Sequence, residues 1–152
     1  MSMILITHII ASTVGIVASY VRTITAIRSK NSADSRLKKY TRVILFAIIV
    51  VVIFGSVLFA EKPAEFLASG RFLSNMTIML VLLGIEILAT KQKTAYKMLQ
   101  FYFASTFTWT WIFLIASFEP SFPYLYFIIA YLLGGYAVCT MVRRVFKQKM
   151  SV

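Results

Sequence analysis

Residues that could do chemistry are scarce in this sequence and stand far apart from one another. There is one histidine, His8, one cysteine, Cys139, and a single acidic residue inside a long apolar stretch, Glu86. One cysteine excludes an internal disulfide and a multi-thiolate metal site, and one histidine excludes a two-histidine metal site within the chain. Motifs of hydrolases, phosphate-binding loops and metalloproteases are also missing. We predict no catalytic residues and no bound metal, and we expect that the chain is not an enzyme.

Glu86 is the most unusual residue by its position. It lies four residues before the charged end of its apolar stretch, about 6 Å deep at the helical rise of about 1.5 Å per residue. An uncompensated carboxylate is costly in an apolar environment, so it needs a cation, a proton or a bound ligand. We predict an ion pair with Arg22, whose guanidinium can donate two hydrogen bonds to one carboxylate. The alternative is a functional carboxylate that binds a proton or a cation.

His8 is a second candidate for ligand or proton binding, together with Asn75. Embedded ionisable residues are functional candidates in membrane proteins. We expect a neutral histidine that forms a hydrogen bond with Asn75, Thr7 or a backbone carbonyl. The alternatives are a polar-ligand or proton site, and a haem iron held by His8 with Met76 or Met79 as second axial ligand. We predict no cofactor.

Aromatic residues offer a third kind of site. Tyr102, Trp109 and Tyr131 lie on the more polar sides of their segments and are candidates for the wall of a pocket for a lipid, quinone or drug-like molecule. The alternative is packing between helices. Because Trp109 and Trp111 are two positions apart on a helix, their rings point to nearly opposite faces, so they cannot both line one cavity.

The segments that must position these residues are long and apolar. Of the 152 residues, 60% are hydrophobic and 14% are charged, against about 45–50% and about 25% in soluble domains. Charged residues divide the chain into five stretches, each near the 20 or so residues that cross a bilayer as a helix. We predict an all-α integral membrane protein, a five-transmembrane-helix bundle that forms a single transmembrane domain over 1–152. The expected helices are about 3–27, 36–60, 72–91, 97–118 and 122–146.

The basic residues predict the orientation. Fourteen of the 16 Lys and Arg residues follow the first, the third or the last of the five apolar stretches, before the next stretch begins. Basic residues concentrate on the cytoplasmic side, so we expect the N-terminus outside and the C-terminus in the cytoplasm, in the cell membrane. The net charge of +11 then implies attraction to anionic lipid headgroups on that side rather than nucleic-acid binding.

Small residues predict how the helices pack. Ala11, Gly15 and Ser19 form a ridge on the first helix, and Gly134 lies on the inner face of the last; small residues let membrane helices approach closely. The apolar stretch 43–60 has no polar residue besides Ser56, so we expect its helix, 36–60, to be the most lipid-exposed of the five.

Three functions fit this sequence. We favour a non-catalytic subunit or accessory component of a larger membrane assembly, in contact with other membrane subunits or with copies of itself. The second is a small transporter or ligand-binding protein with a polar path along the first helix. The third is a membrane redox or enzymatic protein that uses His8 or Glu86.

Overall fold

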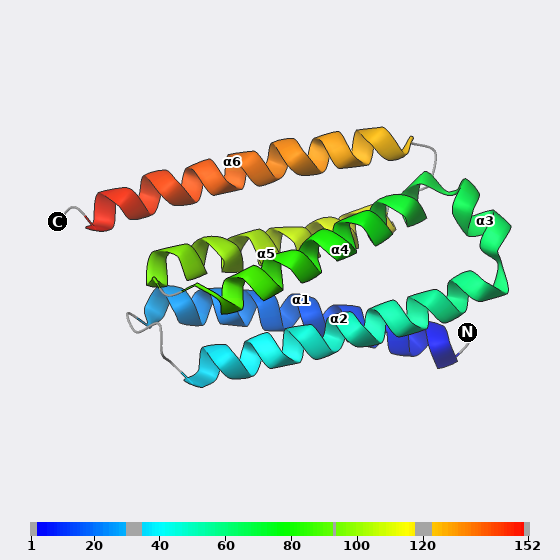
Figure 1. Cartoon of the computed structure of the whole chain (residues 1–152), viewed down its shortest axis with the longest axis horizontal. Helices are drawn as coiled ribbons and strands as arrows, with labels where there is room; N and C mark the ends of the chain where they lie inside the picture. The colour runs from blue at the N-terminus through cyan, green and yellow to red at the C-terminus, as the bar shows by residue number, and fades with distance from the viewer. Residues whose placement is uncertain (1–2, 30–34, 93, 118–122, 151–152) are drawn as a thin grey trace.

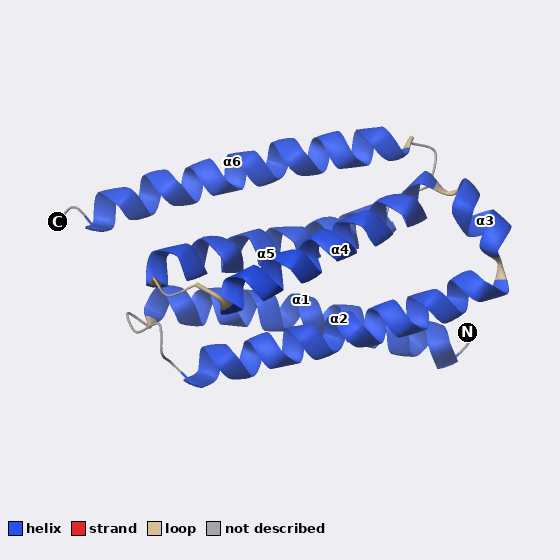
Figure 2. Ribbon diagram, in the orientation of Figure 1, coloured by secondary structure: helices blue, strands red, loops and turns tan. Residues whose placement is uncertain are grey.

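The computed structural model describes residues 3–29, 35–92, 94–117 and 123–150 (Figure 1). These residues form helices joined by short connections, with no strand in the described ranges (Figure 2). The helices are α1 (Met3–Arg28), α2 (Ser35–Glu61), α3 (Pro63–Ala68), α4 (Gly70–Thr90), α5 (Ala95–Ser117) and α6 (Tyr124–Met150). Their ends lie close to the expected ones, and the largest difference is at α6, which continues to Met150 instead of 146.

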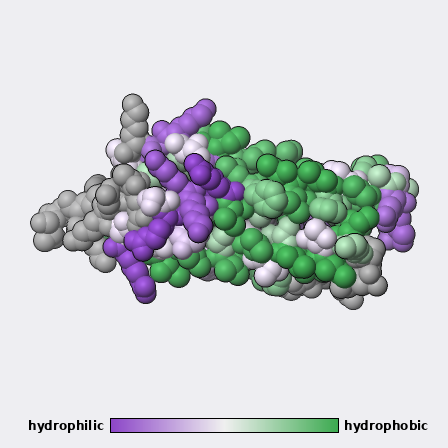
Figure 3. All heavy atoms as spheres, turned by 90° about the horizontal axis from the view of Figure 1, so that it is seen from below, coloured by the Kyte–Doolittle hydropathy of each residue, from purple (hydrophilic) through white to green (hydrophobic). Residues whose placement is uncertain are grey.

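Five of these helices, all except α3, are long and apolar enough to cross a membrane. Helices suit such a setting because each backbone group is hydrogen-bonded within its own segment. On the face seen in Figure 3, apolar residues form a wide band between two ends where hydrophilic residues gather. An all-helical bundle with five candidate spans is therefore the architecture of this chain.

The packing order places α5 at the centre of the bundle. It contacts α1, α4 and α6, while α1 and α2 form the most extensive helix pair, side by side over much of their length (Figure 1). α6 runs along the opposite side of the bundle from α2. Of the described side chains of α6, Tyr131 and Val142 alone are buried.

The prediction that the second helix is the most lipid-exposed is wrong. α2 buries a face against its neighbours, and α6 is the more peripheral helix. The buried residues of α2 are Leu37, Thr41, Ile44, Ala47, Ile48 and Val51. Lipid tails are as apolar as leucine, so an aliphatic face serves equally against lipid and against a helix, and the lack of polar residues does not reveal which it meets.

Trp109 fills the middle of the bundle. It is the largest fully buried side chain described, and it packs against α1 at Gly15. A Cβ atom placed on Gly15 would lie 2.4 Å from Cζ2 of the indole, so no larger residue fits there without displacement. Around Trp109 the core contains aliphatic residues of α1, α2, α4 and α5, with Tyr131 from α6.

At the end of the bundle where the N-terminus lies, α3 connects α2 to α4 (Figure 1). Pro63 occupies the first turn of α3, where its missing N–H costs nothing, and the Ser69 hydroxyl accepts a hydrogen bond from the Phe72 N–H to cap α4. The rings of Phe59 and Phe66 both pack on Phe72, with centroid distances of 5.4 and 4.9 Å. This aromatic cluster holds α2 and α4 together at this end.

Candidate functional site

Arg22 and Glu86 meet in the interior of the bundle. Arg22 ends the buried face of α1, and Glu86 lies on the buried face of α4; both side chains are 0% exposed. The two guanidinium Nη atoms donate to the two carboxylate oxygens, Nη1 to Oε2 at 2.6 Å and Nη2 to Oε1 at 2.8 Å. The pair is thus bidentate, the geometry in which a guanidinium binds a carboxylate best.

Two hydroxyl groups complete this pair. Nη1 of Arg22 also donates to Oγ1 of Thr41 on α2 at 3.2 Å, and Nη2 also donates to Oγ of Ser105 on α5 at 3.0 Å. Ser105 in turn donates to Oε1 of Glu86. The carboxylate therefore accepts three hydrogen bonds, which offset the loss of water that burial imposes on it.

The ring of Tyr102 covers the guanidinium. Cζ of Arg22 lies 4.2 Å from the ring centroid, a cation–π contact that is favourable where water is excluded. Nε of Arg22 has no hydrogen-bond partner within the described residues. The positive charge is thus shared among a carboxylate, two hydroxyl groups and an aromatic face.

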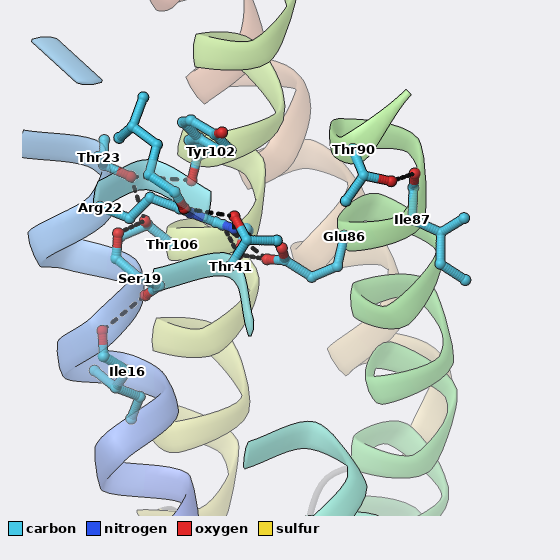
Figure 4. A network of polar contacts seen from close by, with 12 residues as sticks. Ile16, Ser19, Arg22, Thr23, Thr41, Glu86, Ile87, Thr90, Tyr102 and Thr106 are labelled. Carbon is cyan, nitrogen blue, oxygen red and sulfur yellow. Dashed lines mark hydrogen bonds and ion pairs between the residues drawn. The ribbon is translucent and has the colours of Figure 1, made fainter. Parts of the chain in front are cut away.

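We call Arg22, Thr41, Glu86, Tyr102 and Ser105 the polar clamp, because they join four helices at one level (Figure 4). No Cα atom of α1 lies within 8 Å of a Cα atom of α4 in the described ranges, so these two helices meet only through side chains. The clamp therefore bridges across the bundle, and its chemical role in this geometry is to neutralise a buried charge and set the distance between helices.

A second set of hydroxyl contacts flanks the clamp between α1 and α5 (Figure 4). Oγ1 of Thr23 bonds to Oγ1 of Thr106 at 2.9 Å and to the Tyr102 carbonyl at 3.2 Å, and Thr106 bonds to the Ser19 carbonyl at 3.1 Å. These bonds fix the register of α1 on α5, and so they set where Arg22 enters the interior.

A pocket of about 410 Å³ opens next to the clamp, between the first turns of α2, the last turns of α4 and the first turns of α5. Thr41 and Tyr102 belong to the polar clamp and also line the pocket, so they separate the pocket from the ion pair of Arg22 and Glu86. The lining residues are Leu37, Lys38, Thr41, Arg42, Leu45, Ala89, Thr90, Gln92, Met98 and Tyr102.

His8 and Asn75 do not meet. His8 lies against α2, where a Cβ atom on Gly55 would be 3.6 Å from its Cε1, and Nδ1 of His8 and Oδ1 of Asn75 both lack a hydrogen-bond partner in the described chain. Thr7 donates to the Met3 carbonyl instead. His8 therefore bonds to neither Asn75 nor Thr7. α2 and not α4 packs beside this part of α1, and the backbone of Val51 on α2 is the expected kind of partner that lies within reach of the imidazole.

The haem hypothesis required His8 to face the start of α4. Met79 is buried in the core cluster, whereas His8 lies against α2 at Gly55. The haem alternative for His8 stays a prediction. In the described residues no three His, Cys, Asp or Glu side chains cluster as metal ligands would.

Of the aromatic candidates, Tyr102 lies apart from Trp109 and Tyr131, which share one core cluster. Tyr102 lines the pocket, Trp109 packs in the core, and Tyr131 donates to or accepts from Oγ1 of Thr108 at 2.9 Å. The rings of Phe107, Trp111 and Tyr131 pack on one another between α5 and α6. Tyr102, Trp109 and Tyr131 therefore do not line one common pocket.

The small residues predicted at helix contacts lie in close-packed positions. Ala11, Gly15 and Ser19 are buried on α1, and a Cβ atom on Gly134 would lie 2.8 Å from Cζ of Phe107.

Thr41 is one of two clamp residues, with Ser105, that the sequence analysis did not single out. The signal was its spacing, since it shares a helix face with Leu37, Ile44 and Ile48. A threonine in that apolar face requires a polar partner from another helix or from its own backbone, and it has both.

Comparison of the chain with protein-family models, with characterised proteins and with solved structures gives no match. The function must therefore be argued from the residues and their geometry.

Proposed function

We propose that this chain is a non-catalytic subunit of a membrane assembly that binds another membrane protein through the exposed face of α6. It is inserted in the cell membrane with its N-terminus outside and its C-terminus in the cytoplasm. The basis for the orientation is the gathering of basic residues at one end, where α1 ends, α2 begins and α6 ends, since such residues favour the cytoplasmic side.

The observation that carries the proposal is Tyr136. It is 73% exposed, and its hydroxyl makes no hydrogen bond within the described chain. It precedes Arg143 by seven residues, about 10 Å along the helix. Helical side chains lean toward the helix N-terminus, so the hydroxyl points away from the charged end of α6 and into the apolar band.

A hydroxyl group in hydrocarbon needs an acceptor, because lipid tails supply none. The same outward side of α6 carries exposed Ile129, Leu132 and Leu133, which suit helix packing. A partner helix with a carbonyl or side-chain oxygen at the depth of Tyr136 satisfies the hydroxyl and covers this face. We infer that the partner supplies such an acceptor.

The interior of the bundle favours this function over transport or catalysis. The polar residues His8 and Arg22 lie at different levels of α1, and the contact of Gly15 with Trp109 fills the space between these levels. Glu86, the other candidate for proton transfer, is already bound by Arg22 and Ser105. A polar path along α1 is therefore interrupted, and the buried charges are occupied by each other.

Gentle solubilisation of the tagged protein from its native cells, followed by native mass spectrometry, tests the proposal. We expect a complex, and we expect Tyr136→Phe to lower the recovered partner about threefold, because interhelical hydrogen bonds in membranes average about 0.6 kcal/mol. Tyr126→Phe is the matched control, since Tyr126 is also exposed on α6 but lies at its first turn. Recovery of the chain alone, or an equal loss with both variants, would contradict the proposal.

A further inference from the structure

The pocket beside the polar clamp is lined by two basic side chains that take no part in the clamp. Lys38 and Arg42 line it from α2, four residues apart and hence on one face of the helix. Both side chains are exposed, and neither forms an ion pair with a described residue. Two like charges at this spacing repel each other, so an anion between them is stabilising.

The polar clamp does not add to the positive charge that Lys38 and Arg42 bring to the pocket. Arg22 lies behind Thr41 and Tyr102, and its charge is neutralised by Glu86. The attraction for an anion in the pocket therefore comes from Lys38 and Arg42. On the opposite wall the uncharged Thr90 and Gln92 add polar groups, and the Gln92 amide has an N–H that its bond to the Leu88 carbonyl leaves over.

The rest of the lining is apolar. Leu37, Leu45, Ala89 and Met98 form this part of the wall. Leu45 is one turn farther into the apolar band than Arg42 and Thr41, so the pocket changes from cationic to apolar along α2 in the direction of the membrane interior. A molecule that fits both parts has an anionic head and an apolar tail.

The pocket lies among three helices, α2, α4 and α5. α2 and α4 meet at the α3 end through the phenylalanine cluster, and beside the pocket Leu37 of α2 and Ala89 of α4 pack with Tyr102 of α5 in one buried cluster. Basic pockets between membrane helices on the cytoplasmic side are suited to phospholipid headgroups. We propose that this pocket binds the phosphate of an anionic phospholipid between Lys38 and Arg42, with the acyl chains leaving past Leu45 between α2 and α4.

Native mass spectrometry of the purified chain with equal amounts of phosphatidylglycerol and phosphatidylcholine tests this site. We expect preferential retention of phosphatidylglycerol, and we expect Lys38→Gln with Arg42→Gln to reduce it about tenfold or more, because each basic residue near an anionic lipid surface contributes about 1 kcal/mol. Arg143→Gln with Arg144→Gln is the matched control: it removes two exposed charges at the same end, on α6 and outside the pocket, and retention should persist.

A second variant tests the site even if the variant with Lys38→Gln and Arg42→Gln does not fold. Thr90→Glu places a negative charge on the pocket wall at an exposed position and should also reduce retention, whereas Thr94→Glu, exposed and outside the lining, should not. Equal retention of the two lipids would overturn the proposal, and so would equal losses in the pocket and control variants. Inorganic phosphate or glycerol 3-phosphate that displaces the lipid at millimolar concentration would identify a free phosphate ester as the ligand and would also overturn it.

Discussion

Arg22 and Glu86 show what a charge needs in the interior of an apolar bundle. Each partner is inaccessible to water, and each is bonded to the other and to hydroxyl groups on further helices. Such a pair need not stabilise the fold more than well-packed apolar residues would, but breaking it leaves one charge buried and unpaired. Removing both charges should therefore be less damaging than the two single substitutions added together.

We expect Glu86→Gln and Arg22→Gln each to lower the free energy of unfolding by about 3 kcal/mol, the range for a broken buried pair. The double variant should lose about 1–3 kcal/mol less than the sum of the two, because the partners act as a unit. Detergent-titration unfolding in mixed micelles measures all three values. Strict additivity would show that the two side chains are not coupled.

An exposed ion pair provides the control for this cycle. Lys62 and Glu65 lie 3.1 Å apart with side chains 66% and 69% exposed. Exposed pairs contribute little, so Lys62→Gln and Glu65→Gln should each change the unfolding free energy by less than about 0.5 kcal/mol. A loss there as large as at Glu86 would mean that the assay reports net charge and not burial.

At the scale of the helices, the contact between α1 and α5 depends on the absence of a side chain at Gly15. The indole of Trp109 occupies the space that a Cβ atom would take, and indole is rigid, so the backbone itself must shift to admit a methyl group. The hydroxyl bonds of Thr23 and Thr106 lie on the same helix pair and depend on the same spacing. Gly15 therefore matters because it lets α1 and α5 approach closely, and not because of its helix propensity.

Gly15→Ala should therefore destabilise the protein by about 1–3 kcal/mol, as overpacking does. Gly84→Ala is the matched control, since nothing lies within 4 Å of a Cβ atom there. Because alanine favours helix by up to about 1 kcal/mol over glycine, Gly84→Ala should be neutral or stabilising. Thermal unfolding in one detergent compares the two; equal shifts would show that Gly15 is not a close contact.

For the whole molecule, the proposed orientation predicts which surfaces can be reached from outside the cell. In a Cys139→Ser background, Ala64→Cys on α3 should react with an impermeant maleimide in intact cells, and Ser35→Cys at the start of α2 should react only after lysis. Both positions are exposed and lie at opposite ends of the bundle. Labelling of Ser35→Cys in intact cells would reverse the orientation.

Much of the fold could be read from the sequence because the relevant physics is local. An apolar stretch without charges near the length of a bilayer span forms a helix whatever its neighbours are, and five such stretches are present as five long helices. Charge placement singled out Arg22 and Glu86, since a lone carboxylate in an apolar segment needs a cation nearby, and the structure brings the two together.

Some features depend on which helices are neighbours, and the tertiary structure alone decided these. That α2 rather than α4 lies beside His8 follows from the packing of complementary faces, and an aliphatic face such as that of α2 has the same composition whether it meets lipid or protein. The place of Thr41 in the clamp and the pocket lined by Lys38 and Arg42 have the same origin, because both depend on how α2 packs beside α4 and α5. Spacing along one helix cannot encode a distance between two helices, so these features appear only once the bundle is assembled.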